Sequence, residues 1–324
     1  MAVEILKERW AGSVREVTIG ATREAGGTRT ATVAIGGETG LPFLHFEGEM
    51  PNPPRLALEV FDMVPEDWPS VLVEPYKDVL DSPAQWARKC VEEYGADLVM
   101  IRLISADPDL KNSGPDDVVK TVTAVRDAVG VPLIIIGCGD VDKDNQIMPA
   151  VGEALAGENC LLGIAKQENY KSLVATCMVN KHKIIAQSPL DINICKQLNI
   201  LITEMGLPPE SIVIDPMSGA LGYGIEYCYS IMERVRLGAL QGDKMLAMPV
   251  VVFAGQEAWR AKEAKESQVA FPEWGPEDKR GPLWEMMTAS TLLQAGADLI
   301  VMRHPLALNH LREHINNLWK VNGG

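Results

Sequence analysis

The sequence predicts an α/β protein, a (β/α)8 TIM barrel that carries an N-terminal β-hairpin. From residue 53 onward, short apolar runs alternate with amphipathic helical stretches eight times. Several runs, such as residues 133–136 and 250–253, are apolar at successive positions, which is typical of parallel strands buried on both faces. A doubly wound open sheet is the alternative, but it rarely repeats eight such regular units without a second domain.

The eight apolar runs are the expected barrel strands, and a helix is expected after each of them. The strands are predicted at residues 55–62, 97–104, 132–137, 160–165, 183–187, 211–215, 248–254 and 298–303. Ser82-Pro83 before the first helix and Gly95 after it are typical start and stop signals. The helices are predicted from Ser82-Pro83 to 94, from 115 to before Gly130, at 144–156 and 168–180, from Ser188-Pro189 to before Gly206, and at 223–240, 282–294 and 305–319.

The first 50 residues follow a different pattern. Residues 15–22 and 29–36 alternate polar and apolar side chains on either side of Gly26-Gly27, which predicts a β-hairpin. We expect residues 1–52 to be a hairpin and connector that close the N-terminal end of the barrel, and residues 53–324 to form the barrel itself.

Composition and cysteine spacing exclude several classes of function. The chain has 324 residues and a formal charge of −14, which disfavours binding to nucleic-acid phosphates and anionic lipids. No apolar run approaches the roughly 20 residues that span a bilayer, and no signal-peptide pattern begins the sequence, so we expect a cytoplasmic protein. The cysteines contain no Cys-x-x-Cys pair, so we expect buried, reduced thiols and no zinc or iron–sulfur site in this chain. They are Cys90, Cys138, Cys160, Cys177, Cys195 and Cys228.

In a barrel of this kind the loops after the strands form the working face, and three of them are long: residues 63–81, 216–224 and 255–281. The second follows Asp215 and reads Pro-Met-Ser-Gly-Ala-Leu-Gly-Tyr-Gly. Gly219, Gly222 and Gly224 permit positive φ, so backbone amides can turn toward a ligand there. Their spacing is neither the Rossmann nor the P-loop order. Asp215 either binds a ligand or only caps the following turn.

Other polar side chains carry weaker signals. Arg102 is a lone charge within an apolar strand and needs a partner, for which Glu59 on the neighbouring strand is the natural choice. Arg102 either forms a structural ion pair or fills space that holds a ligand in a relative. His310 and His314 have zinc-motif spacing, but they fall on the last outer helix. His304 follows the eighth strand, yet no serine stands in a nucleophile elbow.

Three segments resemble the small subunit of the corrinoid iron–sulfur protein of the acetyl-CoA (carbon monoxide dehydrogenase/acetyl-CoA synthase) pathway. They are residues 45–54 (HFEGEMPNPP), 104–108 (ISADP) and 214–228 (IDPMSGALGYGIEYC). The resemblance implies a barrel paired with a large subunit that carries a four-iron cluster, with a cobalamin-type corrinoid between the two. It also implies that the heterodimer accepts a methyl group from a methyltetrahydrofolate:corrinoid methyltransferase and delivers it to acetyl-CoA synthase.

We expect the loop after the sixth strand to face that corrinoid, although no residue is an obvious cobalt ligand. The predicted cofactor-binding residues are Asp215, Met217, Ser218, Gly219, Gly222, Tyr223 and Gly224.

The sequence also resembles, more distantly, the pterin-binding methyltransferases. Those relatives end strand two with an Asp-x-Asn pattern, where Met100 and Arg102 stand here, and strand three with Asp-Ser, where residues 136–140 read Ile-Gly-Cys-Gly-Asp. Only Asp215-Pro216 keeps their pattern. Each missing hydrogen bond removes roughly 1–3 kcal/mol of pterin affinity, so we expect a barrel that lost catalysis and kept a binding face. An active pterin-dependent methyltransferase and a metal-dependent lyase remain as alternatives.

Overall fold

The computed structural model describes residues 6–323 and contains the eight-stranded parallel barrel. The strands are β3 (Arg55–Phe61), β4 (Leu98–Arg102), β5 (Leu133–Ile136), β6 (Leu161–Ala165), β7 (Lys183–Gln187), β8 (Ile212–Asp215), β9 (Val251–Val252) and β10 (Leu299–Met302). Neighbours in sequence pair from β3 to β8, and β10 pairs with both β3 and β9. A parallel bridge between Ile214 and Val250 joins β8 to β9 and closes the ring. The predicted fold is confirmed.

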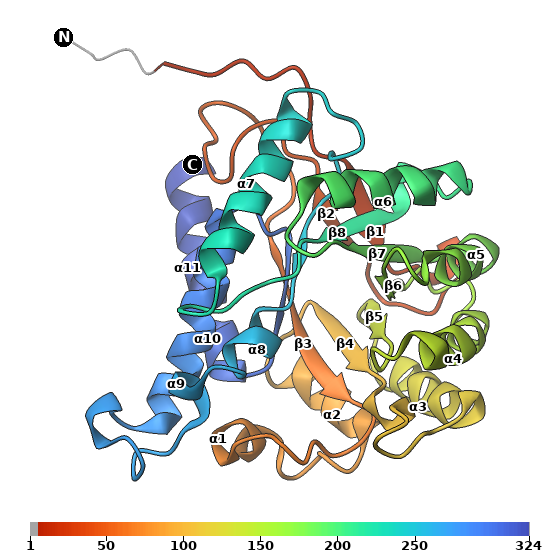
Figure 1. Ribbon diagram of the computed structural model, residues 1–324, viewed down its shortest axis with the longest axis vertical. Coiled ribbons are helices and arrows are strands. Elements are labelled where there is room, and N and C mark those ends of the chain that lie inside the picture. The colour runs from red at the N-terminus through yellow and green to blue at the C-terminus, as the bar shows by residue number, and fades with distance from the viewer. Residues whose placement is uncertain (1–5, 324) are drawn as a thin grey trace.

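Helices surround the barrel, one after each strand (Figure 1). They are α2 (Pro83–Glu92), α3 (Pro115–Ala128), α4 (Val141–Ala154), α5 (Tyr170–Asn180), α6 (Ile192–Glu204), α7 (Ile225–Leu240), α10 (Glu277–Gln294) and α11 (Pro305–Gly323). Short helices α1 (Ser70–Val73), α8 (Ala254–Ala258) and α9 (Lys262–Lys265) lie in two of the long loops that follow strands.

Several boundaries differ from the predicted ones, and side-chain caps explain two of them. Helix α4 begins three residues early because the Asp140 side chain accepts a hydrogen bond from the Lys143 amide at 2.8 Å. Helix α6 begins after Asp191, which caps it, and not at Ser188-Pro189. The seventh strand is reduced to Val251–Val252, since the chain turns into α8 at Ala254. Helix α10 begins at Glu277, so Pro282 lies inside it.

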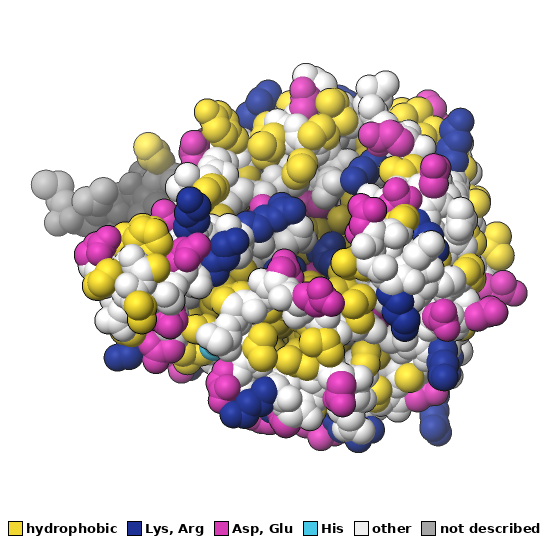
Figure 2. All heavy atoms as spheres, turned by 60° about the horizontal axis from the view of Figure 1, so that its bottom comes forward, with side chains coloured by type: hydrophobic (Ala, Val, Ile, Leu, Met, Phe, Trp, Pro, Cys, Tyr) yellow, Lys and Arg dark blue, Asp and Glu magenta, His cyan; other side chains and the backbone are white. Residues whose placement is uncertain are grey.

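The two ends of the barrel differ in what lies over them. Strands β3 and β4 point toward the bottom of Figure 1, and Figure 2 brings that C-terminal face forward. The opposite end carries the hairpin, β1 (Glu16–Ile19) paired antiparallel with β2 (Val33–Gly36). Its side chains Val17, Ile19, Val33 and Ile35 are buried in one cluster with inward-facing barrel residues. The barrel members include Ala57, Leu98, Ile134, Leu161, Val213, Val251 and Leu299, near the starts of their strands. The hairpin and the barrel share this cluster of buried side chains. The predicted boundary between them at residue 52 therefore stays a prediction.

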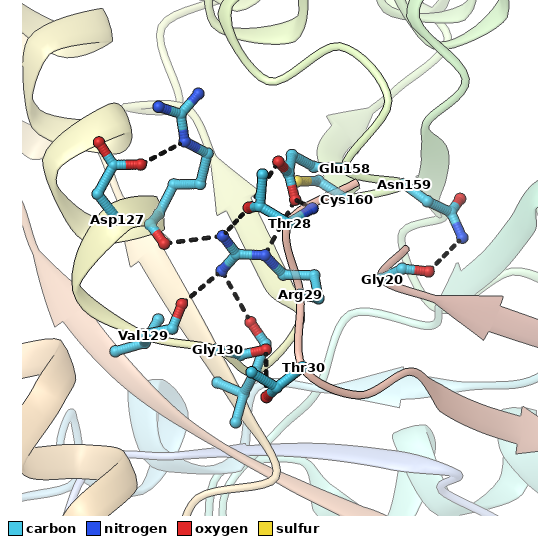
Figure 3. A network of polar contacts seen from close by, with 12 residues as sticks. Gly20, Thr28, Arg29, Thr30, Asp127, Val129, Gly130, Glu158, Asn159 and Cys160 are labelled. Carbon is cyan, nitrogen blue, oxygen red and sulfur yellow. Dashed lines mark hydrogen bonds and ion pairs between the residues drawn. The ribbon is translucent and has the colours of Figure 1, made fainter. Parts of the chain in front are cut away.

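Arg29 fastens the hairpin to the barrel (Figure 3). Its Nε donates to Glu158 at 3.0 Å, and its Nη1 donates to the carbonyl oxygens of Val129 and Val131. Its Nη2 donates to the Thr28 hydroxyl and the Arg126 carbonyl. Arginine has five N–H groups, and each finds an acceptor within the protein. This end of the barrel is therefore sealed by both packing and hydrogen bonds.

Two further expectations concern the whole chain. All six cysteines are unpaired, and five of them are buried, with Cys138 half-buried. Within residues 6–323, no helix has the length and apolar character needed to cross a membrane.

Candidate functional site

The C-terminal end of the barrel is hollowed by a cavity of about 640 Å³. Figure 2 shows the hollow in the middle of this face, with Lys and Arg side chains at its edge and hydrophobic side chains beside it. The cavity is lined by the loop after β3, including Trp68, by Arg102 and Cys138 at the ends of β4 and β5, and by Gln256, Trp259 and Arg303 near the ends of β9 and β10. It is of the size and position at which barrels bind small molecules.

Two arginines of the cavity lining, Arg102 and Arg303, are held by one buried carboxylate. Glu59 is fully buried, and its Oε1 accepts a hydrogen bond from Arg102 Nε at 2.5 Å. Its Oε2 accepts a hydrogen bond from Arg303 Nε. Burial by itself raises the pKa of Glu59, but the charges and hydrogen bonds of Arg303 and Arg102 hold that pKa below its usual value. The predicted Arg102–Glu59 pair is thus confirmed. Arg303, which follows the last strand, forms a second ion pair with the same carboxylate.

Aromatic and polar neighbours fix both guanidinium groups. Arg102 donates from Nη2 to Gln256 Oε1 at 2.6 Å and lies 5.7 Å from the centre of the Phe253 ring. The Arg303 guanidinium lies 5.3 Å from the ring of Phe61 and 5.4 Å from that of Trp68. Such cation–π contacts orient a guanidinium without using its hydrogen-bond donors.

Behind Arg303, the buried carboxylate of Glu285 holds the end of β10. It accepts hydrogen bonds from the backbone amides of Arg303 and His304 and from Trp259 Nε1 at 2.5 Å. Burial raises the pKa of Glu285 to about 7, although these donors oppose the shift. Burial also lowers the pKa of His304 to about 4, and its Nδ1 accepts from the Leu306 amide. His304 is therefore a neutral, structural residue.

The loop after β8 contains the seven residues that the sequence predicts as cofactor-binding. Asp215 is fully buried, and it accepts hydrogen bonds from Gln187 Nε2 at 2.7 Å and from the Met217 amide at 2.9 Å. Burial raises its pKa to about 6, with the hydrogen bonds opposing. Asp215 therefore caps the turn that follows it, and its place among the cofactor-binding residues stays a prediction.

The glycines of this loop have two different structural roles. Gly222 and Gly224 have φ of 72° and 94°, as predicted. Gly219 does not use the freedom that glycine permits, because it does not lie in the left-handed region, and Met217 has the third positive φ of the loop, at 66°. Gly219 is required for another reason, because a Cβ there would lie 2.9 Å from the carbonyl carbon of Gly224.

The predicted residues lie on the C-terminal face but beside the cavity, not in its lining. Met217 and Tyr223 are about half exposed, at 48% and 53%, while Ser218 is half-buried. Tyr223 donates its hydroxyl hydrogen to Glu263 at 3.0 Å and so joins this loop to α9, whose Lys265 lines the cavity. Sequence reasoning placed Gln256 and Trp259 in a long loop of the working face without naming them as site residues, and it missed Arg303.

The positions that hold a pterin in the distant relatives serve other purposes here. Met100 is fully buried within the barrel, and Arg102 is bound to Glu59 and Gln256. Asp140 caps α4. Asp144 accepts hydrogen bonds from the amides of Cys138 and Gly139 and so folds the chain after β5. Within residues 6–323, no group of three or more His, Cys, Asp or Glu side chains is arranged to hold a metal ion.

Comparison with known proteins gives the family. Residues 16–304 match the model of a family described as the CO dehydrogenase/acetyl-CoA synthase delta subunit. The chain belongs to this family. It is 40% identical to the acetyl-CoA decarbonylase/synthase complex subunit delta of Archaeoglobus fulgidus over 327 residues, which cover 99% of this chain and 72% of that protein. It is 38% identical to the subunit of the same name from Methanocaldococcus jannaschii, over 94% of this chain and 74% of that one. The resemblance read from the sequence is confirmed.

Solved structures show the fold independently. A dihydropteroate synthase of Xanthomonas albilineans with 4-aminobenzoic acid superposes with a TM-score of 0.56 at 15% identity, over 86% of this chain and 97% of that one. A dihydropteroate synthase of Coxiella burnetii in complex with pteroic acid gives a TM-score of 0.57 at 14% identity, over 87% and 98%. At these identities the similarity concerns the barrel alone.

Proposed function

We propose that this chain is the non-catalytic subunit of a heterodimeric corrinoid methyl carrier and forms one wall of the corrinoid site. The carrier accepts a methyl group from methyltetrahydrofolate through a methyltransferase and delivers it to acetyl-CoA synthase. Membership of the delta-subunit family supports the place in an acetyl-CoA-forming complex. The observation that carries the proposal is the loop 216–224, which lies on the C-terminal face and has positive φ at Gly222 and Gly224. Beside it, the positions that hold a pterin in distant relatives are occupied by side chains bonded within the protein, such as Arg102 and Asp140.

The residues of this loop fit a corrinoid. A corrin ring is an apolar macrocycle with peripheral amides that both donate and accept hydrogen bonds. Met217 and Tyr223 offer exposed apolar surface, and Gly222 exposes backbone that no side chain covers. These three residues and Gly224 would hold the group, while Asp215, Ser218 and Gly219 shape the loop under them. When bound, the cobalt of the corrinoid carries the methyl group.

A single wall suits a carrier better than a closed pocket. A methyl–cobalt bond must be shielded in one complex and exposed in the next, which requires a surface that partners can approach and leave. A corrinoid bound to this chain alone would make only part of the contacts that it makes between two subunits. It would lose as much translational and rotational entropy in either case. We therefore expect the isolated chain to bind corrinoid weakly and the pair of subunits to bind it stably.

The proposed partners are the large subunit, the methyltetrahydrofolate:corrinoid methyltransferase and the acetyl-CoA synthase/carbon monoxide dehydrogenase. In this proposal the four-iron cluster is carried by the large subunit. The cysteines here support that placement, since within residues 6–323 no group of three or more His, Cys, Asp or Glu side chains is arranged to hold a metal ion. Assays of iron and acid-labile sulfide on the purified chain should read near zero, and stoichiometric iron would contradict this.

The visible absorption spectrum of a corrinoid tests the proposal. The corrinoid is mixed first with the isolated chain and then with both subunits, and methyl transfer from methyltetrahydrofolate is assayed in each mixture. We expect a bound spectrum and methyl transfer only when the large subunit and the methyltransferase are present. Unchanged corrinoid binding with and without this chain would contradict the proposed wall.

A pterin-dependent methyltransferase is the second candidate, because Asp215-Pro216 keeps the strand ending of those relatives. Both carboxylate oxygens of Asp215 already accept hydrogen bonds within the protein. Titration of the isolated chain with a reduced pterin distinguishes the candidates. Saturable pterin binding together with methyl transfer by the chain alone would favour the methyltransferase.

A further inference from the structure

We propose that the cavity at the barrel mouth binds a small molecule through an oxyanion, a phosphate or a carboxylate, held by Arg303 and Arg102. This site goes beyond the corrinoid wall and does not depend on it, since loop 216–224 does not line the cavity. The argument rests on buried charge, on open hydrogen-bond donors, and on the shape and walls of the cavity.

The first observation is that two guanidinium groups in the cavity lining share one ion-paired carboxylate. Arg102 and Arg303 are 14% and 11% exposed, and both pair with the single carboxylate of Glu59, which is fully buried. Within residues 6–323 no other carboxylate forms an ion pair with either guanidinium group. Glu285, which also interacts with Arg303, has its pKa raised by burial to about 7, so near neutral pH it is partly protonated and offsets the second guanidinium group only in part. A partly offset charge in a poorly solvated place is costly unless an anion or water reaches it, so an anionic ligand is favoured there.

The second observation is that donors remain available. Arg303 uses only Nε in its side-chain pairing, and within residues 6–323 its Nη1 and Nη2 have no hydrogen-bond acceptor. Arg102 uses Nε and Nη2, which leaves Nη1. Both residues line the cavity. Paired N–H groups of a guanidinium match the oxygens of a carboxylate or phosphate.

Charges at the rim do not reverse this preference. The rim carries the acidic residues Glu66, Asp67 and Asp107 and the basic residues Arg260 and Lys265. All except the half-buried Asp107 are exposed to solvent, which screens them more than the two arginines of the lining. Arg102 and Arg303 therefore determine that the favoured ligand is negatively charged.

The third observation concerns the remainder of the ligand. A volume of about 640 Å³ exceeds what a bare ion needs and falls in the range of small-molecule sites. Phe61, Trp68 and Trp259 contribute aromatic walls. We therefore expect an apolar body attached to the oxyanion to bind more tightly than the free ion.

Calorimetric titration of the full chain tests the proposal with four probes: inorganic phosphate, phenyl phosphate, benzoate and phenol. We expect phenyl phosphate to bind more tightly than inorganic phosphate, and phenol not to bind measurably. Phenyl phosphate and benzoate distinguish the two sources of the oxyanion, and the tighter of them gives the preferred one. Absence of saturable binding by every anion would overturn the proposal.

Two variants and a control locate the binding. Gln256→Glu keeps the shape of the side chain and places a carboxylate on Arg102, so affinity for the anion should fall about tenfold or more. Arg303→Met should abolish binding. Arg312→Gln, on the outer helix α11, should bind as the wild type does. If Arg303→Met does not fold, as judged by circular dichroism, Gln256→Glu decides, and wild-type affinity in that variant would overturn the proposal.

Discussion

The two ends of the barrel each hold a buried arginine bound to a buried glutamate, and they differ in what else the arginine contacts. Arg29 at the N-terminal end is 3% exposed and donates all its N–H groups to acceptors of the protein. Arg303 at the C-terminal end shares Glu59 with Arg102 and keeps its terminal nitrogens toward a cavity. A saturated arginine serves stability, whereas an arginine with open donors can serve binding.

The carboxylates at the two ends differ in a parallel way. Glu158 at the N-terminal end accepts hydrogen bonds from Arg29 and Thr28, so its charge is matched. Asp215 at the C-terminal end accepts hydrogen bonds only from neutral groups of Gln187 and Met217. The charge of Asp215 is thus less fully compensated than that of Glu158.

The largest expected effect on stability comes from a substitution at the N-terminal end of the barrel, which the hairpin covers. Arg29→Met leaves Glu158 buried without its cation, so the free energy of unfolding should fall by about 3–5 kcal/mol. Urea denaturation measures this change. The control Asp127→Ala, which breaks the neighbouring exposed ion pair to Arg126, should lower stability by no more than about 1 kcal/mol. Equal losses in the two variants would show that this end is not fixed by the buried pair.

The second prediction concerns the pH dependence of stability that arises from Asp215, because burial raises its folded-state pKa from the ordinary 3.8 to about 6. A raised pKa in a carboxyl means that the folded state binds the proton more tightly, so its contribution to stability is present below about pH 4 and is lost as pH rises to 6. The shift corresponds to a free energy on the order of 3 kcal/mol.

Asp215→Asn removes this titration, and the Gln187 amide can turn to pair with the new side chain. Its unfolding free energy relative to wild type should rise from about pH 4 through pH 6 and level off above about pH 7. Urea denaturation across that range gives the difference, in which the other titrating groups cancel. A difference independent of pH would mean that Asp215 is ionised throughout.

The smallest effect on stability is expected from substitution of glycines with positive φ. Substitutions at the two ends of the barrel should cost similar stability but differ in their effect on corrinoid binding. Gly222→Val and Gly224→Val each force a β-branched residue into positive φ, at roughly 1–3 kcal/mol, and should weaken corrinoid retention in the heterodimer. Gly242→Val is the matched control, because Gly242 has φ of 98° and free space at its Cβ but follows α7 at the N-terminal end. Equal corrinoid content in the Gly242 and Gly222 variants would remove loop 216–224 from the site.

Local sequence patterns were enough to predict the barrel. Eight apolar runs match eight strands, since parallel strands covered by helices require apolar residues at successive positions. The starts of helices were less predictable where a side chain caps the helix by accepting hydrogen bonds from backbone amides of its first turn. Asp140 caps α4 in this way, and Asp191 caps α6. Pro282, taken as a helix start, lies within α10 because Pro276 and the acidic Glu277 and Asp278 begin it earlier.

The site was only partly predictable, because its contacts join distant parts of the chain. Adjacency of the first two barrel strands is enough to pair Glu59 with Arg102, but Arg303 lies 244 residues from Glu59. A signal for it existed, since closing a barrel places the last strand beside the first and Arg303 ends the last run. The cavity itself depends mainly on how the loops after β3, β4 and β9 fold, which periodicity does not encode.

The central claim is that the C-terminal face of the barrel, and not the hairpin end, meets the corrinoid and its large subunit. Hydrogen–deuterium exchange tests it directly, by comparing the chain alone with the chain in the corrinoid-loaded heterodimer. The account predicts slower exchange in residues 216–224 on assembly and unchanged exchange in residues 16–36. Protection of the hairpin with no change in residues 216–224 would contradict it.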